Sequence, residues 1–88
     1  MKYEDLREGD VFAIEDIKSY PKIKTHGTGY LDMRDEIRGT DTTVSGRNVE
    51  LLSAKQIADN STWGPETEQS VTDWINDIKK RCFITSRN

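Results

Sequence analysis

Residues 8–37 constrain the fold more than any other part of the chain, because they read as antiparallel strands joined by tight turns. The sequence VFAI at residues 11–14 combines β-branched and aromatic side chains, which favours a strand. Residues 20–25 then alternate, so that Lys22 and Lys24 face one way and Ile23 faces the other. The HGTG sequence at residues 26–29 supplies the glycines that a hairpin turn needs for positive φ angles. The pattern predicts a β-hairpin.

The return strand of this hairpin is expected over residues 30–34. Leu31 and Met33 point inward in this register, whereas Tyr30, Asp32 and Arg34 point outward. We expect a further inward contact from residue 37, a turn at 39–41, a short strand at 42–44 and another turn at 45–48. Residues 49–52 then return to the core.

The pattern changes to helical at Ser53. Ser53 and Gln56 have the spacing of a capping box, which predicts a short helix that carries Ile57 inward. A second helix is expected to begin near Pro65, since proline suits a first helical turn. One apolar stripe follows at helical spacing, formed by Val71, Trp74, Ile75, Ile78 and Cys82. Residues 83–86 are expected to form an edge strand.

These elements and the composition predict one small domain over residues 1–88. Residues 1–52 are mainly antiparallel β and residues 53–82 are helical. Only 33% of the residues are hydrophobic and 33% are charged, with a mean hydropathy of −0.81, so the core is thin for an 88-residue chain. The expected fold is α+β, with a small antiparallel sheet or half-open SH3-like barrel packed by a C-terminal amphipathic helix.

Charge and cysteine content exclude several classes. A net charge of −3 is too negative for a typical duplex-DNA binder and far too small for a DNA mimic. The single cysteine, Cys82, excludes an internal disulfide and favours a reducing compartment. The chain has no apolar run of membrane-spanning length and begins without a signal-peptide pattern. We therefore expect a cytoplasmic protein with no membrane partner.

The residues most often used in catalysis have structural explanations here. The one histidine, His26, lies in the glycine turn, and one His with one Cys is too few for a zinc site. Asp32, Asp35 and Glu36 lie close in sequence, but a surface ion pair with Arg34 explains them as well as acid–base chemistry does. We expect neither enzymatic activity nor a metal or cofactor.

The outward face of the hairpin is the strongest functional candidate. Lys22, Lys24, Tyr30 and Arg34 project together if the two strands pair in simple register, with Tyr20 beside them. Basic groups among aromatic rings suit an acidic protein surface, and they equally suit single-stranded nucleic acid or a nucleotide. A solvated sheet face is the structural alternative.

Trp63 lies in a loop, outside the apolar stripe of the second helix. Tryptophan is enriched among interface anchors, so Trp63 joins the hairpin residues as a candidate contact with a partner. Capping of the hydrophobic core is the alternative role.

Part of the chain resembles small uncharacterised bacteriophage and bacterial proteins built around a β-module. The resemblance covers residues 3–37 and follows a pattern of GD-x-F, then Y-x-K, then GY-x-D-x-R. It is carried by Gly9, Asp10, Phe12, Tyr20, Lys22, Gly29, Tyr30, Asp32 and Arg34. It implies a small β-module in a phage or accessory-gene setting, and it attaches no catalytic residue.

Two functions follow as expectations. The first is a non-enzymatic interaction protein, phage-encoded, that binds and modulates a host protein with an acidic surface in the host cytoplasm. The second is a module that binds single-stranded nucleic acid or a nucleotide through the same face. An exposed strand edge at Phe83 and Ile84 would also allow pairing into a homodimer.

Overall fold

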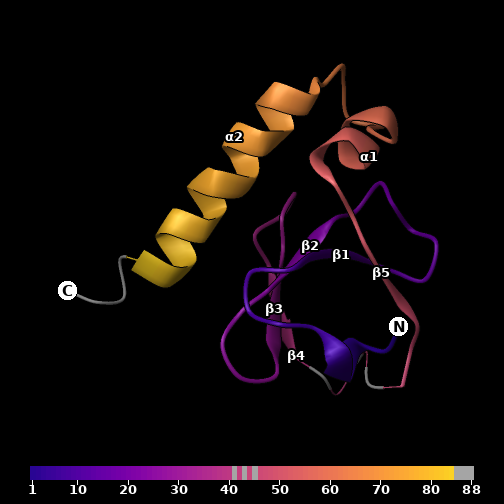
Figure 1. Cartoon of the computed structure of the whole chain (residues 1–88), viewed down its shortest axis with the longest axis vertical. Helices are drawn as coiled ribbons and strands as arrows, with labels where there is room; N and C mark the ends of the chain where they lie inside the picture. The colour runs from indigo at the N-terminus through magenta and orange to yellow at the C-terminus, as the bar shows by residue number, and fades with distance from the viewer. Residues whose placement is uncertain (41, 43, 45, 85–88) are drawn as a thin grey trace.

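The computed structural model describes residues 1–40, 42, 44 and 46–84 (Figure 1). A 3₁₀ helix, η1, opens the chain, five strands follow, and the two α-helices and a π-helical turn, η3, come last. In order these elements are η1 (Tyr3–Asp5), β1 (Val11–Ile14), β2 (Lys22–Lys24), β3 (Gly29–Asp32), β4 (Arg38–Thr40), β5 (Val49–Leu51), α1 (Ala54–Asp59), α2 (Glu68–Lys79) and η3 (Lys80–Ile84). The α+β class is thus confirmed, with an open antiparallel sheet and a C-terminal helix.

The five strands form one sheet in the order β4-β3-β2-β1-β5, and every neighbouring pair is antiparallel. The predicted hairpin is β2 and β3, in which Lys22 faces Asp32 and Lys24 faces Tyr30. Gly27 in the connecting turn has a φ of 65°, as the glycine pattern predicted.

One face of the sheet packs against the helices. Figure 1 shows α2 running along one side of the sheet, with α1 beside its beginning. This core contains the predicted inward residues of the hairpin and the apolar stripe of α2. Its buried members are Val11, Ala13, Ile23, Leu31, Met33, Leu52, Ile57, Val71 and Ile78.

The other face carries a second core, which the sequence pattern did not predict. Tyr3 and Leu6 from the N-terminal segment cover Phe12 on β1, and the three rings of Tyr3, Phe12 and Tyr30 meet edge to face. Val44 also packs into this cluster. The sheet is therefore buried on both faces over part of its area, rather than solvated on one.

Reciprocal caps begin both helices. Ser53 and Gln56 form the predicted capping box of α1. Helix α2 begins three residues later than the proline pattern predicted, because Thr67 accepts a hydrogen bond from the Ser70 N–H and the Ser70 side chain bonds back. A hydroxyl cap and not the proline therefore defines the start of α2.

Several local expectations were wrong. Residues 38–40 form an edge strand where a turn was expected, and the Ile37 side chain is 64% exposed instead of inward. Thr42 has 3₁₀-helical conformation and is not in a strand, Val44 lies in a turn, and residue 43 is outside the described residues. Residues 83 and 84 continue the helix as η3 and do not form an edge strand, while residues 85 and 86 are outside the described part.

No helix in the described part of the chain combines the length and the apolar character that crossing a bilayer requires.

Candidate functional site

Four of the predicted contact residues meet at one end of the sheet, around the guanidinium of Arg34. The Arg34 Cζ atom lies 4.4 Å from the centre of the Tyr20 ring and 4.7 Å from the centre of the Trp63 ring. Lys22 adjoins this sandwich, with its Nζ atom 5.9 Å from the centre of the Tyr20 ring. We call Tyr20, Lys22, Arg34 and Trp63 the Arg34 cluster.

The turn after β3 holds Arg34 in place. An Asp32 Oδ1 atom accepts hydrogen bonds from the backbone N–H groups of Arg34 and Asp35, which fixes the turn. Arg34 Nη1 donates to the Ser19 carbonyl at 3.2 Å, which joins this turn to the segment that precedes β2. These hydrogen bonds join only the turn after β3 and the segment before β2. The pairing of β2 with β3 therefore sets the position of the guanidinium.

The chemistry of Arg34 suits an external acceptor. A guanidinium has five N–H donors, and the Ser19 carbonyl takes one. Among the residues that the structure describes, no Asp or Glu side chain pairs with Arg34. Two rings flank the group, and the N–H donors that Ser19 does not use can bind a carboxylate or phosphate, in bidentate fashion where the geometry allows.

Lys22 contributes less free charge than the sequence suggested. Its Nζ atom lies 3.1 Å from Asp32 Oδ2, and the two side chains are only 13% and 15% exposed. It also donates to the Tyr20 carbonyl at 3.0 Å. Lys22 therefore supports the hairpin and the backbone at Tyr20, and much of its charge is compensated within the molecule.

Lys24 and Tyr30 do not belong to this cluster, which corrects the predicted face. Lys24 is 6% exposed, and its ammonium donates to the carbonyls of Thr25 and Gly27 in the hairpin turn. Tyr30 packs into the second core. The alternation placed both residues on the correct face, but η1 and its neighbours cover that end of the face.

Trp63 takes the core-capping role that was considered as the alternative, and its contact with a partner stays a prediction. It packs against the main core and meets Trp74 of α2 edge to face, with ring centres 5.8 Å apart. Its ring also forms one wall around Arg34. Tyr20, the other wall, is 41% exposed. The cluster therefore has a fixed wall on the helix layer and an exposed wall on the sheet layer.

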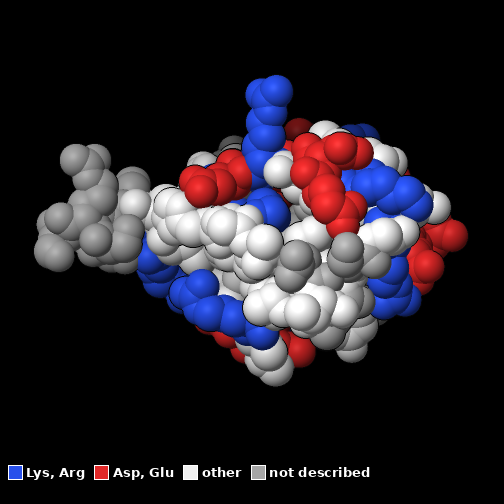
Figure 2. All heavy atoms as spheres, turned by 90° about the horizontal axis from the view of Figure 1, so that it is seen from below, with Lys and Arg blue, Asp and Glu red and all other residues white. Residues whose placement is uncertain are grey.

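Charges of both signs are dispersed over the face of the molecule in Figure 2, and neither sign forms a continuous field among the residues drawn there in colour. On this face, recognition of a charged partner would depend on local groups and not on a broad electrostatic surface.

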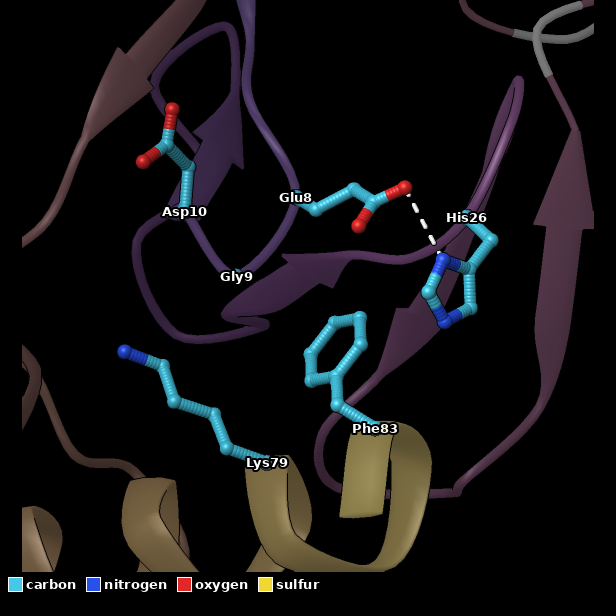
Figure 3. Close-up of a pocket in the computed structure, with 6 residues that line it drawn as sticks. All are labelled: Glu8, Gly9, Asp10, His26, Lys79 and Phe83. Carbon is cyan, nitrogen blue, oxygen red and sulfur yellow. Dashed lines mark hydrogen bonds and ion pairs between the residues drawn. The ribbon is translucent and has the colours of Figure 1, made fainter. Parts of the chain in front are cut away.

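A separate pocket of about 420 Å³ lies between the sheet and the end of the helix layer (Figure 3). It is lined by Glu8, Gly9, Asp10, His26, Lys79 and Phe83. His26 Nδ1 lies 2.9 Å from Glu8 Oε1, and the His26 and Phe83 rings meet edge to face at 5.1 Å. Sequence reasoning missed this site because three segments distant in the chain form it.

Ion pairs of Arg81 join the end of the helix layer to the segment before β4. Arg81 pairs with Glu36 in the turn before β4 and with Asp77 one helical turn earlier. The hydrogen bond to Glu36 raises the pKa of Arg81 above its ordinary value, and nearby carboxylate charge adds to the effect. Arg81 remains a cation at every physiological pH and ties η3 to the sheet.

Two of the acidic residues near the hairpin have structural partners. Asp32 caps its own turn and pairs with Lys22, and Glu36 pairs with Arg81. Within residues 1–40, 42, 44 and 46–84, no group of three His, Cys, Asp or Glu residues has an arrangement that would hold a metal ion.

Comparison with known proteins finds no matching family model, no matching curated protein and no matching solved structure.

Proposed function

We propose that the protein is a non-enzymatic interaction protein that binds an acidic surface of another protein through the Arg34 cluster. One observation carries the proposal: the Arg34 guanidinium lies between the Tyr20 and Trp63 rings without a carboxylate partner among the described residues. Aromatic walls reduce the side-chain entropy that Arg34 loses on binding, and a bidentate carboxylate pair rewards its fixed orientation.

The composition of the cluster is that of an interface anchor. Trp, Tyr and Arg are the residues most enriched among interface hot spots. Trp63 and Arg34 are half-buried and Tyr20 is exposed, so a partner would complete their burial without rearranging the core. In the finer form of the proposal the protein is phage-encoded and modulates a host protein, which is supported only by the resemblance of residues 3–37.

The first test captures partners from a bacterial lysate with three immobilised proteins: the wild type, Arg34→Gln and Arg7→Gln. Arg7 is an exposed arginine that precedes β1 and does not belong to the Arg34 cluster. Each variant therefore loses one positive charge, and only Arg34→Gln changes the cluster. We expect a protein retained by the wild type and Arg7→Gln and lost with Arg34→Gln. Identical partner sets for all three proteins would contradict the proposal.

Binding of nucleic acid by the same cluster is the competing function. It predicts that fluorescence polarisation of labelled single-stranded DNA or RNA rises with protein concentration at low salt, and that added salt reverses the rise steeply. Arg34→Gln would abolish this signal if the cluster were responsible. Saturable, Arg34-dependent binding of the oligonucleotide would replace the protein-partner proposal with this one.

A further inference from the structure

We propose that the pocket lined by Glu8, Gly9, Asp10, His26, Lys79 and Phe83 binds a flat nitrogen heterocycle that carries an anionic group, of the kind a purine mononucleotide presents. The pocket is separate from the Arg34 cluster and shares no residue with it. Its volume of about 420 Å³ is in the range of small-molecule sites. We call it the Phe83 pocket.

The sheet side of the Phe83 pocket is preformed. The Gly9 N–H donates to the Lys24 carbonyl at 2.8 Å, and the Lys24 N–H donates to the Asp10 carbonyl at 2.9 Å, which fastens the turn before β1 to β2. Gly9 has a φ of 88°, a conformation that glycine adopts without strain. The Asp10 carboxylate accepts the Arg7 N–H within the same turn. A ligand would therefore meet a wall that is already ordered.

Glu8 supplies the hydrogen-bond acceptor that such a ring needs. One carboxylate oxygen lies 2.9 Å from His26 Nδ1, which orients the group, and the Glu8 side chain is 53% exposed. A carboxylate offers about four lone-pair sites on its two oxygens. It can therefore still accept from adjacent N–H donors, such as those on the hydrogen-bonding edge of guanine.

Phe83 and Lys79 supply the remaining complementary groups. Figure 3 shows the Phe83 ring between the Lys79 and His26 side chains, so it supplies an aromatic wall of the pocket. A flat ligand ring would pack against this wall. The Lys79 stem passes the Gly9 turn, and its ammonium has no ion-pair partner among the described residues. Lys79 ends α2, so its charge is available to a phosphate at the rim of the pocket.

The combination of groups selects the ligand class. The lining places two carboxylates, of Glu8 and Asp10, and one ammonium, of Lys79, around one space, so a ligand that matches all three needs hydrogen-bond donors and an anionic group at separate positions. A ring with N–H donors on one edge and an anionic group on the other satisfies both charges, while its faces use the aromatic wall. A purine mononucleotide combines these three features in one molecule.

The test titrates ¹⁵N-labelled protein with guanosine monophosphate, guanosine and inorganic phosphate and follows the amide and imidazole signals. We expect saturable shifts at Gly9, His26 and Phe83 with guanosine monophosphate, weaker binding of guanosine and no binding of phosphate alone. Glu8→Gln and Lys79→Met should each weaken guanosine monophosphate by about tenfold, as loss of a charged hydrogen bond does.

Lys80→Met is the matched control, because Lys80 is the exposed neighbour of Lys79 and does not line the pocket. It should leave the affinity within about twofold, since an exposed charge outside the pocket lining contributes little. Absence of shifts with guanosine monophosphate at millimolar concentration would overturn the proposal, and so would equal weakening by Lys80→Met and Lys79→Met. Far-UV circular dichroism of each variant establishes that the fold is intact.

Discussion

At the residue scale, the same alternation that positions Lys22 and Lys24 leads them to different environments. Both lie on the face predicted for them, two residues apart along β2. The Lys22 ammonium donates hydrogen bonds to the Asp32 carboxylate and to the Tyr20 carbonyl. Lys24 lies under Tyr3, with its Nζ atom 5.8 Å from the centre of that ring. A lysine in a strand therefore becomes a surface group or a buried one according to what a distant segment covers.

Burial of Lys24 predicts a large effect of charge reversal. Lys24→Glu would place a carboxylate against the Thr25 and Gly27 carbonyls, and burying an unpaired charge costs about 3–5 kcal/mol of the free energy of unfolding. Urea denaturation followed by tryptophan fluorescence measures this cost. Lys55→Glu, at an exposed position on α1, is the control and should cost about 1 kcal/mol or less. Equal costs at the two positions would show that Lys24 is not buried.

Gly39 predicts a second effect that depends on one contact. A Cβ atom added to Gly39 would overlap the Tyr30 ring, which Tyr3 and Phe12 prevent from moving away. Gly39→Ala should therefore cost about 1–3 kcal/mol, the usual penalty of overpacking.

The double variant Gly39→Ala/Tyr30→Leu isolates the cause of that cost. The Gly39→Ala substitution should cost far less in the Tyr30→Leu background than in the wild type, because the ring that it meets is absent. An unchanged cost in both backgrounds would place the effect in the β4 backbone and not in the ring contact.

At the element scale, the helices were predicted best, because their signals are local. The Ser53 capping box and the apolar stripe of α2 depend only on spacing within one segment. Helix α2 buries Val71 and Ile78 completely, while Trp74 and Ile75 flank them. The hairpin was predicted for the same reason, since its turn contains glycine and its strands alternate.

Two isoleucines of α2 test this packing with one substitution. Ile78→Ala should cost about 2–5 kcal/mol because it leaves a cavity in the main core. Ile75→Ala, three residues earlier on the same helix, should cost less because the side chain is only half-buried. Thermal denaturation compares the midpoints of the two variants. Both substitutions are Ile→Ala within α2, so the change in helix propensity is the same and the difference reports packing. A larger loss for Ile75→Ala would contradict the orientation of α2.

The cap of α2 gives a prediction of smaller size. Thr67→Ala removes the side-chain acceptor for the Ser70 N–H and should cost about 1 kcal/mol. Thr62→Ala, at an exposed loop position, should be close to neutral. The two variants differ only in position, so equal midpoints in chemical denaturation would show that Thr67 is not the cap.

At the scale of the whole molecule, the second core could not be read from the sequence. Tyr3 and Leu6 have no periodic pattern around them, and their burial depends on η1 folding across the far face of β1. The same long-range packing explains why Lys24 and Tyr30 are covered on the face predicted for contact, and why the Phe83 pocket was not predicted. Local patterns predict elements and faces, whereas coverage of a face is a property of the assembled chain.

The two cores share one sheet, so they should unfold together. Trp63 and Trp74 report on the helix side, while Tyr3 lies on the other side. Tyr3→Ala should lower the midpoint of the unfolding transition that tryptophan fluorescence follows, although Tyr3 packs in the other core. Far-UV circular dichroism should give the same midpoint. A tryptophan transition unaffected by Tyr3→Ala would show that the two faces are independent.

The central claim, that the Arg34 cluster contacts an acidic protein, is tested most directly by the side-chain signals of Arg34 and Trp63. Nuclear magnetic resonance spectra would be recorded with and without the partner recovered by capture. The account predicts that the Arg34 Nε–H and Trp63 Nε1–H signals shift most, together with the Tyr20 amide, because the partner binds around the guanidinium. Unchanged Arg34 and Trp63 signals, with shifts concentrated elsewhere on the protein, would contradict it.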